Sequence, residues 1–66
     1  MQILLNGEWR EAERGETIEG LLTRLGIDAR RVVVERNLEI LPKAHYARTQ
    51  LAEGDRIEVV QFVGGG

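Results

Sequence analysis

The chain has 66 residues, enough for one small domain, and it contains neither cysteine nor serine. Disulfides, zinc–thiolate sites and Ser or Cys nucleophiles are therefore excluded. Nine basic and eleven acidic residues are mixed along the chain and give a net charge of −2, so we expect no nucleic-acid partner, which would need a clustered basic face. No apolar run approaches the roughly 18 residues of a membrane span. The first residues do not resemble a secretory signal, so we expect a cytoplasmic protein without a membrane partner.

The chain begins with a predicted β-hairpin, in which strands 1–5 and 8–12 are joined by Asn6-Gly7. This dipeptide favours a type I′ turn, which needs positive φ at both central residues. A two-residue turn fixes the register, so that Leu4 faces Trp9. Because side chains alternate along a strand, Leu4 and Trp9 share one face. The other face carries an apolar set: Met1, Ile3, Leu5 and Ala12.

A short helix is predicted after the polar segment 13–16. The hydroxyl of Thr17 can accept a hydrogen bond from the first turn, as N-cap residues do. Four apolar residues then recur at helical spacing and form one stripe: Ile18, Leu21, Leu22 and Leu25. Gly26 suits the left-handed conformation that ends many helices. Gly20 lowers the helical propensity, and its lack of a side chain could permit a close approach to a sheet.

Two further strands are predicted in the middle of the chain. Residues 32–35 are rich in β-branched side chains, and 39–41 form a short strand that ends at Pro42. Asn37 begins the turn between them. Leu38 is an awkward residue for that turn if positive φ is required there, because a bulky side chain disfavours it.

The pattern over residues 43–50 is weak, and we expect a helical turn or a loop there. Tyr46 and Leu51 are the expected packing residues of this region. A turn follows at 53–55. The last strand is predicted over residues 56–63.

The element order is therefore strand, strand, helix, strand, strand, strand. A helix with a single apolar stripe has to lie across one face of a sheet. We predict an α+β fold, a β-grasp roll in which four or five strands form a mixed sheet and the first and last strands are parallel neighbours. The domain is expected to span residues 1–63, followed by a flexible glycine tail at 64–66.

This arrangement predicts an apolar surface on the face away from the helix. Four residues point there and are the predicted partner-binding residues: Leu4, Trp9, Val60 and Phe62. With the first and last strands adjacent, they would form one patch, and a contiguous apolar patch is typical of a partner site. Two alternatives stay open, because the segment 43–50 could cover this face or the register could differ.

The chain ends with a glycine tail, Gly64, Gly65 and Gly66. Such a tail has no side chains and can thread a narrow channel, so it could deliver its carboxylate to the active site of another protein. Taken alone, the tail is equally compatible with a loose chain end. The rest of the sequence predicts no catalytic set: His45 is the single histidine, and the acidic residues are scattered, so no metal site is expected.

The chain resembles the ThiS family, the ubiquitin-like β-grasp sulfur carriers of thiamine thiazole biosynthesis. The likeness covers the whole chain, and its specificity lies in the ordered set of segments that ends in Gly-Gly. One departure is Leu38, where a small turn residue is more usual; it concerns the turn and not the chemistry. The matching segments are Met1–Glu8, Thr17-Ile18 with Leu21-Leu22, Val34–Asn37, Glu39–Pro42, Gly54–Val60 and Phe62–Gly66.

The resemblance implies that the chain is a carrier and not an enzyme. An E1-like, ThiF-like adenylating enzyme would use ATP to activate the carboxylate of Gly66, with Gly65 as its required neighbour and Gly64 extending the tail. Sulfur from a persulfide enzyme would then replace AMP and give a thiocarboxylate, which donates sulfur to a ThiG-like thiazole synthase. The carrier would bind no cofactor or metal itself and would be a monomer when free.

Three alternatives remain at this point. A carrier like the small subunit of molybdopterin synthase would use the same chemistry for another client, although such chains tend to be longer. A ubiquitin-like protein modifier would join Gly66 to lysines of other proteins. A plain interaction module would have an inert tail.

Overall fold

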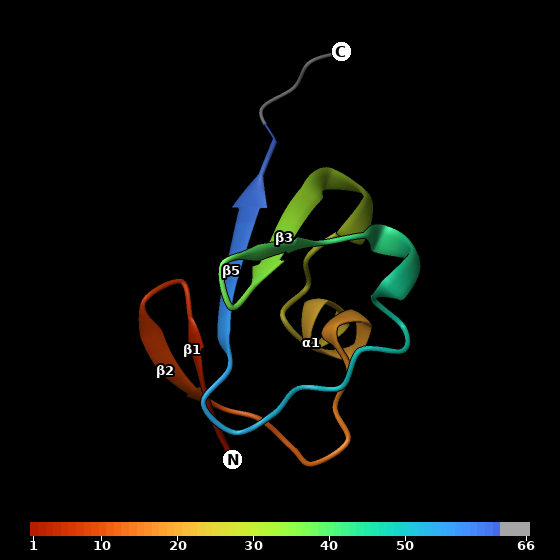
Figure 1. Cartoon of the computed structure of the whole chain (residues 1–66). Coiled ribbons are helices and arrows are strands. Elements are labelled where there is room, and N and C mark those ends of the chain that lie inside the picture. Colours follow the sequence, from red (N-terminus) through yellow and green to blue (C-terminus); the bar gives the residue numbers. More distant parts are fainter. Residues whose placement is uncertain (63–66) are drawn as a thin grey trace.

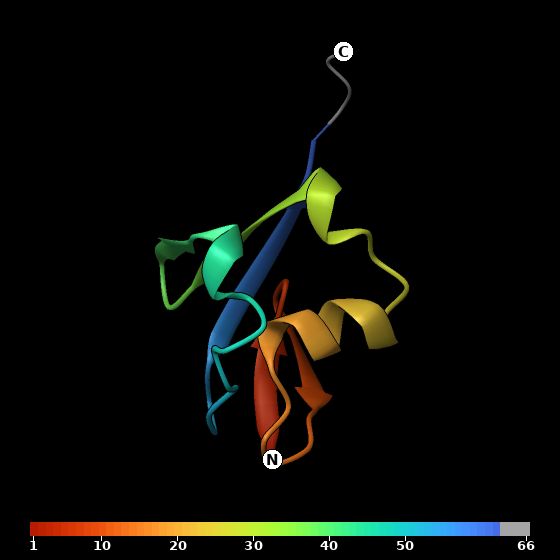
Figure 2. The same cartoon turned by 90° about the vertical axis from the view of Figure 1, so that its right-hand side faces the viewer.

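The computed structural model describes residues 1–62, and the fold within them is a five-stranded mixed sheet with one α-helix. The sheet order is β2-β1-β5-β3-β4, in which β1 and β5 are parallel and the other pairs antiparallel. Helix α1 lies on one side of this sheet (Figures 1 and 2). The elements are β1 (Gln2–Leu5), β2 (Glu8–Glu11), α1 (Ile18–Arg24), the 3-10 turn η1 (Ala29–Arg31), β3 (Val32–Arg36), β4 (Glu39–Leu41), the 3-10 turn η2 (Lys43–His45) and β5 (Arg56–Gln61).

This architecture confirms the predicted β-grasp roll, including the parallel first and last strands. The last strand ends at Gln61, two residues earlier than predicted. Val63 and the predicted tail 64–66 lie outside the described residues.

The first hairpin has the predicted turn and register. Asn6 and Gly7 adopt φ values of 47° and 82°, and Leu4 faces Trp9. The turn is also attached to β5, because the Asn6 Oδ1 accepts a hydrogen bond of 2.8 Å from the backbone N–H of Val59. One asparagine therefore shapes the hairpin and holds it against the central strand.

The helix begins as predicted, with the Thr17 Oγ1 accepting from the backbone N–H of Gly20 at 3.0 Å. It ends before Gly26, which has a φ of 71°. The suggested role of Gly20 is wrong: a Cβ there would lie 3.3 Å from the Thr17 Oγ1 and would meet no atom of the sheet within 4 Å. Gly20 leaves room for the capping hydroxyl.

The core lies between α1 and the sheet, and Tyr46 and Leu51 belong to it as predicted. The segment that contains them is tied to the start of the helix, because Leu51 donates its backbone N–H to the carbonyl of Glu16 at 2.8 Å. The buried apolar residues are Ile3, Leu5, Ala12, Ile18, Leu21, Leu22, Val32, Val34, Tyr46, Leu51 and Ile57.

The turn between β3 and β4 places Leu38 at a φ of 72°, in the left-handed region. A leucine there costs about 1–2 kcal/mol relative to ordinary backbone conformations. The side chain is 69% exposed, so it gains little from burial in return. The predicted difficulty at Leu38 is therefore present in the folded chain as local strain.

Replacing Leu38 by glycine should relieve that strain. Glycine raises the conformational entropy of the unfolded chain, which offsets part of the gain, so we expect Leu38→Gly to increase the free energy of unfolding by about 0.5–1 kcal/mol. Urea unfolding measures the change. The matched control is Glu39→Gly, at an exposed strand position next to the turn, which should destabilise the protein. Destabilisation of similar size by both substitutions would show that the turn is unstrained.

Candidate functional site

The central strand β5 leads toward the glycine tail. Its residues 57–61 pair with β3, whereas β1 pairs only with its beginning, at Arg56 and Ile57. Phe62 follows β5 directly, and its backbone N–H donates to the carbonyl of Arg31 at 3.0 Å. The chain therefore leaves the sheet beside η1. The predicted reactive residue, Gly66, and its neighbours 64–65 lie outside the described residues.

The face of the sheet away from α1 can be described by its cross-strand rows. Residues that face each other in neighbouring strands share a face. One row holds Trp9, Leu4 and Arg56 across β2, β1 and β5. The next row holds Glu58, Glu35 and Ile40 across β5, β3 and β4. The third row holds Val60 and Val33, at the end where β5 leaves the sheet.

These rows correct the predicted apolar patch. Trp9, Val60 and Phe62 are exposed as expected, and Leu4 is half-buried, but the four do not form one surface. Leu4 faces Arg56, and Val60 is four residues further along β5, about 13 Å away. Arg56 and Glu58 lie between them on the same face and form an ion pair at 3.7 Å.

A second apolar group, which was missed from the sequence, lies further along β5 and on the neighbouring strands. Val33 faces Val60 directly, and the exposed Ile40 lies diagonal to Val33. Together with Phe62, which follows β5, we name these residues the tail-side patch: Val33, Ile40, Val60 and Phe62. Side chains alternate along a strand, so Val33 faces away from the core if Val32 and Val34 face it, as they do. This alternation was the signal in the sequence that could have identified Val33.

Asp55 is buried directly before β5 and holds the strand in place. Its carboxylate accepts hydrogen bonds from the backbone N–H of Ala52 at 2.8 Å, from the Asn37 Nδ2 at 3.1 Å and from the Arg36 Nε at 3.1 Å. Burial raises the pKa of Asp55, but these three donors together outweigh burial and hold the pKa below its ordinary value. The β3–β4 hairpin is thereby joined to the start of the tail-bearing strand.

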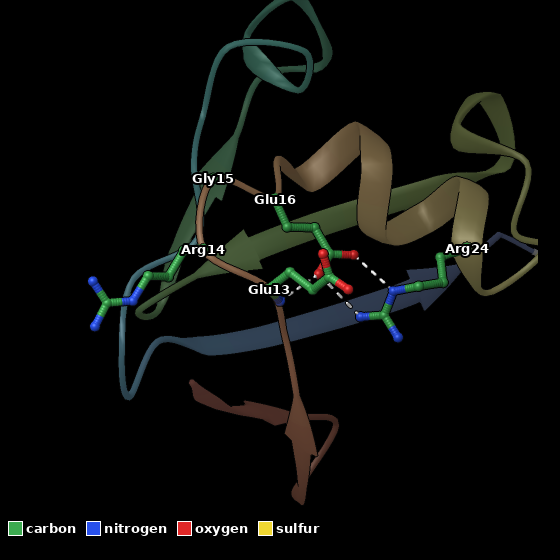
Figure 3. A pocket seen from close by; sticks show the side chains of 5 residues that line it. All are labelled: Glu13, Arg14, Gly15, Glu16 and Arg24. Atoms are coloured by element: carbon green, nitrogen blue, oxygen red, sulfur yellow. Dashed lines mark hydrogen bonds and ion pairs between the residues drawn. The ribbon is translucent and has the colours of Figure 1, made fainter.

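A surface pocket lies at the loop before α1 and contains none of the predicted site residues (Figure 3). The carboxylate of Glu16 points to Arg24 and accepts from its Nε at 2.7 Å, which lowers the pKa of Glu16. Arg14 points away from this pair (Figure 3). The ion pair between Glu16 and Arg24 fixes the loop to the helix.

Within residues 1–62, no group of three His, Cys, Asp or Glu residues is placed to hold a metal ion. His45 is half-buried at the end of η2, and its carbonyl accepts a hydrogen bond of 2.8 Å from the Thr49 Oγ1. Over the same residues, no helix is long and apolar enough to cross a membrane.

Comparison with known proteins connects this geometry to a family. The family model for the ThiS family matches residues 3–66. The sulfur carrier protein ThiS of Bacillus subtilis is 46% identical over 50 residues, which cover 76% of each chain. The crystal structure of the thiamine biosynthesis protein ThiS from Geobacter metallireducens superposes with a TM-score of 0.83 at 32% identity, over 100% of both chains.

A longer relative aligns with the whole length of this chain. A thiazole synthase of Paramagnetospirillum magneticum is 50% identical over 66 residues, which are 100% of this chain and 20% of that protein. The chain thus spans about a fifth of the length of this relative.

Proposed function

Because this chain belongs to the ThiS family, we propose that it is a sulfur carrier for formation of the thiazole of thiamine. The observation that carries the proposal is the family match, which extends from residue 3 to residue 66 and so includes the glycine tail. The relatives named thiazole synthase support thiazole synthase as the client. The chain would be a co-substrate of its partner enzymes and would catalyse nothing itself.

The proposed chemistry takes place at the carboxylate of Gly66, which is a poor electrophile until it is activated. A carboxylate oxygen attacks the α-phosphorus of ATP on the adenylating enzyme, and pyrophosphate leaves. The terminal sulfur of a persulfide then attacks the acyl carbon, and AMP leaves. A second thiol cleaves the resulting sulfur–sulfur bond and releases the thiocarboxylate. The acyl adenylate has to be shielded from water, and a tail without side chains suits a closed site.

The tail-side patch is the proposed docking surface for the adenylating enzyme. Three of its four apolar residues are exposed and Val33 is half-buried, and Val60 and Phe62 lie where the chain leaves the sheet. Trp9 and Leu4 are separated from it by Arg56 and Glu58, so we expect them to contribute less. A well-packed centre with a weaker surround is the usual distribution of energy in an interface.

Substitutions that introduce a charge test whether the tail-side patch contributes more to docking than Trp9 and Leu4 do. Val60→Glu should raise the KM of the adenylating enzyme for the carrier by roughly tenfold or more, because a central apolar contact is replaced by a buried charge. Trp9→Glu is the matched control on the same face and should have a smaller effect. Both residues are exposed, so the melting temperature should change little. Equal effects of the two substitutions would restore the predicted four-residue patch, and no effect of either would contradict docking on this face.

Intact-mass analysis tests the proposed function. The chain ending at Gly66 is incubated with a ThiF-like enzyme, ATP, a persulfide donor and a reducing thiol. We expect an ATP-dependent mass gain equal to the exchange of one oxygen for sulfur. Isopeptide-linked adducts would indicate a protein modifier instead, and an unchanged mass would contradict the proposal.

A further inference from the structure

Phe62, the last residue that the structure describes, is held against η1. The backbone N–H of Phe62 donates to the carbonyl of Arg31 in η1 at 3.0 Å. The Nζ of Lys43 lies 5.5 Å from the centroid of the Phe62 ring, within the range of a cation–π contact. The backbone of Phe62 is therefore bound to η1, and its ring lies beside Lys43 of η2.

Lys43 is itself fixed in position. Its Nζ donates to the carbonyl of Ala29 at 2.8 Å and to the carbonyl of Val32 at 2.7 Å. These carbonyls belong to the first residue of η1 and to the residue directly after η1, so the ammonium closes the turn that also receives Phe62. The charge is thus presented to the ring from a defined place.

Core packing contributes little to holding Phe62. Its side chain is 52% exposed, and the preceding residues Val60 and Gln61 are exposed as well. The end of a strand with few buried contacts opens easily. The contacts with Lys43 and Arg31 are therefore what keep Phe62 against η1.

We propose that Lys43 is a positioning residue that fixes the point from which the glycine tail starts. The inference rests on the proposed function, in which Gly66 enters the active site of a partner. Gly66 is four residues beyond Phe62, so its carboxylate reaches at most about 14 Å from that point. If Phe62 detaches, docking of the tail also has to order Phe62 and Gln61, which costs conformational entropy. Lys43 lowers this entropic cost without contacting the reacting atoms.

The first part of the test measures the contact in the free protein. In Lys43→Met we expect the amide hydrogen of Phe62 to exchange roughly three to ten times faster, while the buried Ile57 keeps its rate. Arg48→Met is the matched control, since it removes the same charge from an exposed residue close in sequence to η2. A wild-type exchange rate at Phe62 in Lys43→Met would overturn the proposal.

The second part measures adenylation of the same variants by ATP–pyrophosphate exchange. Lys43→Met should raise the KM for the carrier roughly three- to tenfold and leave kcat unchanged, because the docked tail is the same once ordered. Lys43→Arg, which keeps the cation, should recover most of the loss. Faster amide exchange with an unchanged KM, or a reduced kcat at unchanged KM, would overturn the positioning role. A wild-type chain that is not adenylated would instead contradict the proposed function, and the inference with it.

Discussion

Removal of Gly66, or addition of one residue after it, should abolish sulfur transfer and leave thermal unfolding unchanged. One residue moves the terminal carboxylate by about 3.3–3.6 Å, whereas a displacement of 1 Å from the attack geometry can already cost about 100-fold in rate. We therefore expect a loss of at least about 100-fold in thiocarboxylate formation. Rates are followed by mass spectrometry after addition of ATP.

The control for this experiment is Arg48→Met, which alters an exposed residue and leaves the tail intact. It should react at the wild-type rate. If the shortened or extended chain kept more than about a tenth of the wild-type rate, the terminal carboxylate could not be the reacting group.

Asp55→Ala should have the largest effect on stability of any substitution considered. The Asp55 side chain is buried, with the residue only 5% exposed, and its removal leaves the donors of Ala52, Asn37 and Arg36 without their acceptor. The Arg36 side chain is 34% exposed, so water can replace part of the interaction that Arg36 loses with Asp55. We expect a decrease of about 2–4 kcal/mol in the free energy of unfolding, against a total of about 3–5 kcal/mol for a domain of this size.

Thermal unfolding measures this effect, with an expected decrease in Tm of roughly 10–30 °C. The matched control is Glu53→Ala, which removes an exposed carboxylate from the same turn and should change Tm by only a few degrees. Equal shifts for the two variants would contradict the role given to Asp55.

The pKa of Asp55 also predicts a pH dependence. Because the pKa is lowered in the folded state, the ionised carboxylate contributes stability that is fully present above its unfolded pKa of about 3.9. That contribution is lost as the pH falls through the lowered folded pKa. The stability difference between wild type and Asp55→Asn should therefore shrink below about pH 4. A difference that stays constant between neutral and acidic pH would show that the charge contributes nothing.

Local features of the fold could be predicted from the sequence because short-range chemistry determines them. Asn6-Gly7 specifies both the turn and the register of the first hairpin, and Thr17 specifies the start of the helix. The alternation along β5 correctly separated the buried Ile57 from the exposed Val60.

Long-range register could not be predicted in this way. β1 and β5 are separated by most of the chain, and no turn fixes which of their residues face each other. The predicted patch therefore joined Leu4 to Val60, whereas the parallel pairing places Arg56 beside Leu4. The same reason hid the partners of Asp55, since Asn37 and Arg36 are 18 and 19 residues away in the sequence.

The central claim is that the carbonyl carbon of Gly66 carries the sulfur, and locating the sulfur within the chain tests it most directly. The sequence has no cysteine, so no thiol of the chain can hold a persulfide, but oxidation of Met1 adds one oxygen and gives nearly the same mass gain. An alkylating reagent marks the sulfur of a thiocarboxylate, and fragmentation of the alkylated chain then shows which residue carries the mark. We predict that C-terminal fragments carry the alkylated sulfur only when ATP is present. Sulfur elsewhere in the chain, or a mass gain confined to fragments with Met1, would contradict the account.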